Sequence, residues 1–181
     1  MDGLTVILLL SIGSFVFGLL LSIFQHQEDK TQRIPFWVVA KFLQGTGSLI
    51  LFFRGAAPDF ATVLTANSLL LLGCAYEAWA IYYIVRQPVS RRIHVAMTAA
   101  IVIATLSTAL LSFPHRLAVF FLFQSVFYFL PGWVLLSGRE AKSWLRSVLG
   151  FSFALLTFLN FLCALQLFLG LGLLHARRNA G

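Results

Sequence analysis

Two charged side chains lie inside long apolar stretches of this sequence, where a charge is unusual. Lys41 stands about 9 Å from the start of one stretch, and Glu77 lies about 13 Å from the end of the next, at a helical rise of about 1.5 Å per residue. Because the stretches are consecutive and antiparallel, an ion pair between the two residues is geometrically reasonable. It would act as a proton-sensitive or ligand-contacting pair, or it would only fix two helices together. A third alternative is that Lys41 extends to the headgroups.

Three amide side chains form a second candidate site. Asn67, Gln124 and Asn160 all fall about 9–12 Å below the opposite, outer edge of the apolar stretches, counted at the same helical rise. Amides at matched depth can hydrogen-bond across helices or line a pocket open to the outside. An unrelated scatter of polar residues is the remaining alternative.

No arrangement of residues in the sequence predicts catalysis or metal binding. None of the four histidines has a cysteine, aspartate or glutamate at metal-ligand spacing, and no general base stands beside a nucleophile. Cys74 and Cys163 lie at different depths, so we expect no disulfide between them. We therefore expect a protein that is not an enzyme and that needs no metal and no cofactor.

The composition is that of an integral membrane protein. Of the 181 residues, 60% are hydrophobic and only 10% are charged, whereas soluble domains have about 25% charged residues. The net charge of +7 does not predict nucleic-acid binding, because the lysines and arginines lie mostly in short turns between apolar runs. That distribution indicates membrane topology and contact with anionic lipid.

The apolar runs predict an all-α bundle of six transmembrane helices. Each run is long and nearly continuous, whereas barrel strands alternate over about 10 residues. We expect one domain over residues 1–181, with no soluble domain and with a tight turn at 114–116. The predicted helices are 3–25, 36–53, 60–85, 95–113, 117–137 and 148–174.

The basic residues also predict the orientation of the bundle. The first, third and fifth links carry most of them: Lys30, Arg33, Arg86, Arg91, Arg92, Arg139, Lys142 and Arg146. The opposite side carries Arg54, Arg116, Arg177 and Arg178. Because cytoplasmic loops are enriched in lysine and arginine, we expect both termini on the outer, periplasmic side of a bacterial inner membrane.

Residues 42–88 resemble the N-terminal membrane sensor region of bacterial diguanylate cyclases. In that family, an arginine-glycine turn meets a proline-aspartate pair, and the next span opens with an asparagine, a leucine run and a glycine. The matching residues here are Arg54, Gly55, Pro58, Asp59, Asn67, the leucines of 69–72 and Gly73. Residues 145–151 are similar to the family's basic link into its next span.

The resemblance implies a membrane input module for signal transduction that responds to a small-molecule or lipid signal and acts as a homodimer. The family continues with a seventh span and a cytoplasmic domain with the GGDEF motif, and neither occurs in this sequence. We therefore expect either a truncated sensor or a stand-alone homologue, without cyclase activity. The family has a basic residue late in the sixth span, but the corresponding stretch of this sequence, LNFLCALQLF, has none. The resemblance therefore does not extend to a ligand contact at that place.

Two other classes of protein fit the same residues. A small transporter or channel subunit would use Lys41, Gln44 and Glu77 along a polar path. A structural or immunity-type membrane protein would instead bind a partner helix through the phenylalanine-rich faces of the fifth and sixth runs.

Overall fold

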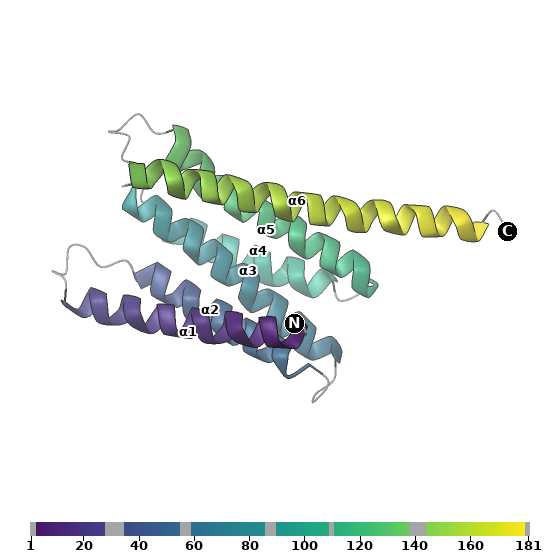
Figure 1. Ribbon diagram of the computed structural model, residues 1–181, viewed down its shortest axis with the longest axis horizontal. Coiled ribbons are helices and arrows are strands. Elements are labelled where there is room, and N and C mark those ends of the chain that lie inside the picture. The colour runs from purple at the N-terminus through teal and green to yellow at the C-terminus, as the bar shows by residue number, and fades with distance from the viewer. Residues whose placement is uncertain are drawn as a thin grey trace. The chain divides into compact units, whose positions relative to one another are not determined.

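The described part of the chain is helical apart from short turns. The computed structural model describes residues 3–27, 35–54, 59–85, 90–108, 111–137 and 144–179. These residues contain no strand, which confirms the all-α prediction for them. The helices in Figure 1 are α1 Gly3–Gln27, α2 Pro35–Phe52, α3 Asp59–Ile84, α4 Arg91–Ser107, α5 Phe113–Ser137 and α6 Trp144–Asn179.

Among the described residues, four helices are long and apolar enough to cross a membrane. The candidate spans are Gly3–His26, Ala61–Tyr83, Pro114–Ser137 and Arg146–Gly170, in α1, α3, α5 and α6. The apolar parts of α2 and α4, Phe36–Phe52 and His94–Ile103, are shorter. A bilayer core about 30 Å thick needs about 20 helical residues, so length and composition support four spans directly.

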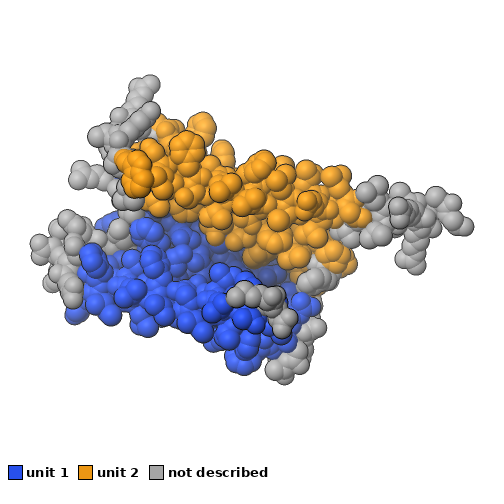
Figure 2. Space-filling model, viewed as in Figure 1, with its two compact units in different colours: residues 1–106 blue, residues 107–181 orange. Residues whose placement is uncertain are grey.

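The chain divides into two compact units, which Figure 2 shows in different colours. Unit 1 comprises residues Met1–Leu106 and contains α1, α2, α3 and nearly all of α4. Unit 2 comprises Ser107–Gly181 and contains α5 and α6. In unit 1, α2 packs against both α1 and α3, and in unit 2, α5 packs against α6.

The contact between α1 and α2 is close because small residues meet large ones. The Ser11 hydroxyl, only 1% exposed, donates a hydrogen bond of 2.9 Å to the carbonyl oxygen of Gly45. A Cβ at Gly45 would lie 3.1 Å from the Phe15 ring. This bond satisfies the Ser11 hydroxyl inside an apolar contact, where an unpaired hydroxyl would destabilise the fold.

Glycines also set the spacing between α2 and α3. A Cβ at Gly47 would lie 3.0 Å from the carbonyl oxygen of Ala66, and a Cβ at Gly73 would lie 3.1 Å from that of Ala40. Each helix therefore presents a glycine to the backbone of the other. The two antiparallel backbones approach closely enough for polar side chains of one helix to reach those of the other.

The turn between α4 and α5 lies earlier in the chain than the sequence predicted. The fourth helix was expected to reach residue 113, with a turn at 114–116, but α4 ends at Ser107 and α5 begins at Phe113. Pro114 is tolerated in the first turn of a helix because amide groups there have no helical partner. The backbone amide of Arg116 donates a helical hydrogen bond of 2.9 Å to the Ser112 carbonyl oxygen. Residues 114–116 therefore belong to the first turn of α5 and do not form the predicted turn. In addition, α6 extends beyond the predicted 148–174 at both ends.

In unit 2, two glycines bring α5 and α6 together. A Cβ at Gly132 would lie 3.3 Å from the Phe153 Cβ, and a Cβ at Gly150 would lie 2.8 Å from the end of the Leu136 side chain. The Tyr128 and Phe153 rings also meet, with their centroids 5.9 Å apart. These contacts define one face of α6 as the face covered by α5.

Arg146 caps the end of α5 from the start of α6. Its Nε donates to the carbonyl oxygen of Leu135 at 2.9 Å, and its Nη2 donates to that of Val134 at 3.1 Å. The last four carbonyls of a helix have no partner within that helix, and α5 ends at Ser137. Arg146 therefore satisfies two of these carbonyls while its charge stabilises the negative end of the helix dipole.

Replacing Arg146 with alanine is expected to lower the free energy of unfolding by about 1–3 kcal/mol, because both charged hydrogen bonds are lost. Arg146→Lys should recover only part of this, since an ammonium group lacks the planar fork that reaches two carbonyls. Denaturant unfolding of the full chain in detergent micelles, followed by circular dichroism, measures the effect. The matched control is Arg92→Ala, at an exposed arginine of α4. Equal stability of the two alanine variants would contradict the capping role.

Candidate functional site: a charge cluster between two helices

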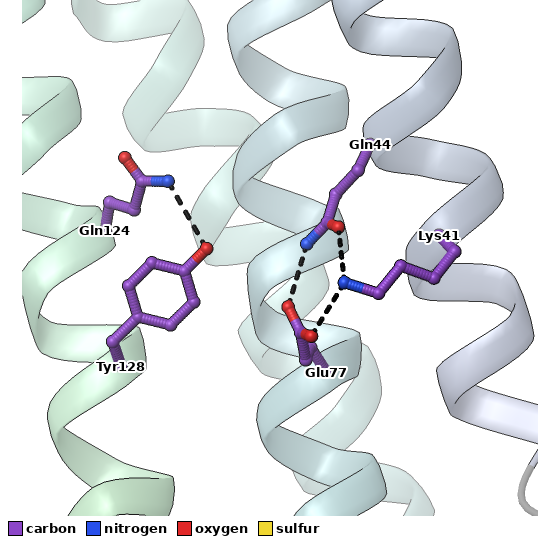
Figure 3. A network of polar contacts seen from close by, with 5 residues as sticks. All are labelled: Lys41, Gln44, Glu77, Gln124 and Tyr128. Atoms are coloured by element: carbon purple, nitrogen blue, oxygen red, sulfur yellow. Dashed lines mark hydrogen bonds and ion pairs between the residues drawn. The ribbon is translucent and has the colours of Figure 1, made fainter. Parts of the chain in front are cut away.

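Lys41, Gln44 and Glu77 form a closed ring of polar contacts between α2 and α3. The Lys41 Nζ lies 2.8 Å from the Glu77 Oε1 as a salt bridge. The Gln44 Nε2 donates to the other carboxylate oxygen, Glu77 Oε2, at 2.9 Å. The Lys41 Nζ also donates to the Gln44 Oε1 at 3.0 Å, which closes the ring (Figure 3).

We call these three residues the charge cluster. Its two charged side chains are largely buried. The exposed fractions of the Lys41 and Glu77 side chains are 17% and 11%. The Phe17 ring of α1 lies near the ammonium group, with its centroid 5.8 Å from the Lys41 Nζ. An aromatic ring within about 6 Å of a cation attracts it, so α1 contributes to the site as well.

The local sequence explains why the three groups meet. Lys41 and Gln44 are three residues apart, so they share one face of α2. Gly73 precedes Glu77 by one helical turn and lies on the same face of α3. A Cβ at Gly73 would lie 2.6 Å from the Gln44 Cγ, so the space that glycine leaves empty is the space that Gln44 uses.

The structure joins the predicted pair directly, without an intervening group between Lys41 and Glu77. The sequence analysis did not include Gln44 in the ion pair, although it placed Gln44 beside Lys41 and Glu77 on the polar path of the transporter alternative. Its position three residues after Lys41 is the signal that could have included it. With Gln44, both carboxylate oxygens of Glu77 are hydrogen-bonded, as a buried carboxylate requires.

The three predicted amides lie in different units. Asn67 is buried in α3 of unit 1, at 7% exposure. In unit 2, the Gln124 Nε2 donates to Tyr128 Oη at 3.5 Å, and the Asn160 Nδ2 donates to the carbonyl oxygen of Leu156 at 2.7 Å. These two bonds stay within one helix each, and a pocket shared by the three amides stays a prediction.

Arg54 and Asp59, the residues of the predicted turn, flank residues 55–58, which lie outside the described part. Arg54 is exposed directly after α2, and its amide donates to the Leu51 carbonyl at 3.2 Å. The next helix, α3, begins at Asp59. Arg54 therefore follows the end of α2, and Asp59 begins α3.

A group of aromatic rings surrounds His94, which directly precedes the predicted fourth helix, 95–113. The structure places it in the first turn of α4. Its ring stacks on Phe36 of α2, with centroids 5.2 Å apart, and meets the edge of Trp79 of α3 at 4.3 Å. His94 therefore connects α4 to the same two helices that hold the charge cluster.

Other reactive groups are dispersed. Within the described ranges, no three histidine, cysteine, aspartate or glutamate side chains lie close enough to hold a metal ion. Neither Cys74, which is buried, nor Cys163, which is exposed, takes part in a disulfide. The charge cluster is thus the candidate site to which the structure gives the most polar contacts between helices.

The fold and the charge cluster define an all-helical membrane protein with polar, charged groups between two of its helices. The comparisons identify no relative: no family model, no curated protein and no solved structure matches the chain.

Proposed function

We propose that this chain is a sensory input module with six transmembrane helices in a bacterial inner membrane, and that it transmits a signal without catalysing a reaction. The proposal adds α2 and α4 to the four longer spans and places both termini on the periplasmic side. It rests on the resemblance of residues 42–88 to the membrane region of diguanylate cyclases. The observation that carries it is the charge cluster.

The charge cluster supports sensing because it holds two helices together through groups that a signal can change. Charged residues inside spans are costly and commonly mark functional positions. A proton on Glu77, or a ligand that takes over one of its hydrogen bonds, removes the main attraction between Lys41 and α3. The packing of α2 against α3 then has two arrangements, and a signal that favours one of them shifts the population.

The signal itself is proposed to be a small molecule or a lipid that binds among the outer-half amides or acts through the bilayer. Asn67, Gln124 and Asn160 remain the candidate contacts. Amides suit this role because each carries both a donor and an acceptor and can exchange a bond within the helix for a bond to a ligand. Asn160 and Gln124 each have such a bond within the helix.

Transport is the second candidate function, and the charge cluster also favours it. Lys41, Gln44 and Glu77 carry both signs of charge and an amide inside apolar helices, as ion and proton pathways do. A transporter would move protons or ions across liposomes that contain the purified chain. Flux that disappears in the Glu77→Gln variant would support transport over sensing, and absence of flux would support sensing.

We expect acidification to separate α2 from α3 near the charge cluster in the wild-type sequence and not in the Glu77→Gln variant. Spin labels at the exposed positions Val39 and Tyr83, after replacement of both native cysteines, report this distance in nanodiscs. The mean distance should increase as the pH falls, because protonated Glu77 no longer attracts the Lys41 ammonium group.

Two further variants make the experiment specific. His94 is a second titratable group near these helices, so His94→Phe should keep the pH response if Glu77 is its source. Lys41→Met should remove the response, because no charge then remains for the carboxylate to pair with. A pH response that survives in Glu77→Gln would contradict the sensing role of the charge cluster.

A further inference from the structure

The exposed surface of α6 has two chemically different sides. Counted at about 100° per residue from the stripe that faces α5, the exposed phenylalanines lie about 40–140° to one side. They are Phe151, Phe158, Phe161 and Phe168. The exposed polar residues Ser152, Cys163 and Gln166 lie about 100–160° to the other side. The phenylalanine side suits lipid, whereas the other side carries one amide, that of Gln166, which lipid does not satisfy.

Gln166 is the residue on that side that most requires a partner. It lies within the apolar span Arg146–Gly170, its side chain is exposed, and it makes no hydrogen bond among the described residues. Its neighbours behave differently, since the Ser152 hydroxyl donates to the Val148 carbonyl and the Asn160 amide donates to the Leu156 carbonyl of the same helix. The Gln166 amide is therefore left with a donor and an acceptor to offer.

We propose that this side of α6 binds the same side of α6 in a second copy of the chain. An amide is self-complementary, because its NH₂ group can donate to the carbonyl oxygen of an identical amide. A two-fold axis along the membrane normal places each residue of a helix opposite its own copy, so Gln166 meets Gln166. Lipid offers neither donor nor acceptor at this position, and the phenylalanine side offers no polar group to a partner.

The same axis brings two further residues of each helix face to face. Leu159 and Cys163 precede Gln166 by seven and three residues, so they lie along one stripe of a helix pair. Leu159 supplies apolar contact, being 48% exposed in the single chain. Cys163 then lies opposite Cys163, within reach of an oxidant. The proposal does not depend on the sensory role, because a dimer forms or fails to form independently of any signal.

Oxidative cross-linking of the full chain in native membranes tests the interface. We expect a disulfide-linked dimer with copper phenanthroline that is retained in Cys74→Ala and lost in Cys163→Ala. In a background without native cysteines, Leu159→Cys and Gln166→Cys should cross-link as well. The matched controls, Phe158→Cys and Phe161→Cys on the lipid side, should not. Equal cross-linking at the control positions, or a bond only within one chain, would overturn the proposal.

The role of the amide has its own measurement. Energy transfer between two labelled copies in liposomes gives the dissociation constant of the dimer. Gln166→Leu should weaken the dimer by about 3- to 30-fold, the effect of losing an interhelical hydrogen bond in a membrane, while Gln166→Asn should weaken it less. Helix content from circular dichroism should stay equal in both variants. An unchanged dissociation constant in Gln166→Leu overturns the assignment of Gln166 to the interface.

Discussion

Replacing Glu77 with leucine is expected to lower the free energy of unfolding by about 2–4 kcal/mol, because the ammonium group of Lys41 is left without its partner. Leucine keeps the volume, so the loss reports the charge rather than a cavity. The side chains are mostly buried, so the ammonium group cannot regain full solvation where it lies. Denaturant titration of the full chain in mixed micelles, followed by circular dichroism, measures this difference.

The double variant Lys41→Met with Glu77→Leu provides the control for that experiment. An apolar pair of similar volume commonly replaces a buried ion pair at little or no loss of stability. We therefore expect the double variant to regain most of the stability lost in Glu77→Leu. If the two substitutions instead add independently, Lys41 and Glu77 do not interact, and the charge cluster does not hold α2 and α3 together.

Replacing Gly73 with valine is expected to lower the free energy of unfolding by about 1–3 kcal/mol and to break the charge cluster. The added Cβ would lie 2.6 Å from the Gln44 Cγ and 3.1 Å from the Ala40 carbonyl oxygen. The Gln44 side chain can move aside, but the backbone of α2 cannot do so without separating from α3. The valine variant should therefore also lose most of the pH-dependent change in distance.

The matched control for Gly73→Val is Gly13→Val on α1. Apart from the adjoining backbone of α1 itself and the two neighbouring residues, no heavy atom lies within 4 Å of a Cβ at Gly13, so the same substitution meets open space there. Its stability and its pH response should be those of the wild type. A similar loss in both variants would mean that valine disturbs the helices by its conformational preference, and not through contact between α2 and α3.

The sequence was sufficient to predict the helices and the pairing of opposite charges. Long apolar runs predict helices because each run must satisfy its own backbone hydrogen bonds in lipid. Lys41 and Glu77 could be matched because consecutive helices are antiparallel, so depth along one helix translates directly into depth along the next. That argument needs only the rise per residue, which is the same for every helix.

The sequence was not sufficient where rotation about a helix axis decides the contact. Depth alone placed Asn67, Gln124 and Asn160 at one level, but it does not say which way an amide points. The structure bonds Gln124 and Asn160 within their own helices. Gln44 shares one face of α2 with Lys41 by its spacing, but its contact with Glu77 also needs the space that Gly73 leaves on α3. The start of α5 was misplaced because Pro114 was taken as the turn, although proline is also favourable inside a first helical turn.

The distance between the labels on α2 and α3 tests the central claim most directly. The comparison is between the wild-type sequence and the Glu77→Gln variant in nanodiscs at neutral pH, with labels at Val39 and Tyr83 after replacement of both native cysteines. We predict a longer mean distance in Glu77→Gln, because its neutral amide does not attract the Lys41 ammonium group as the carboxylate does. An equal distance in the two proteins would contradict the account.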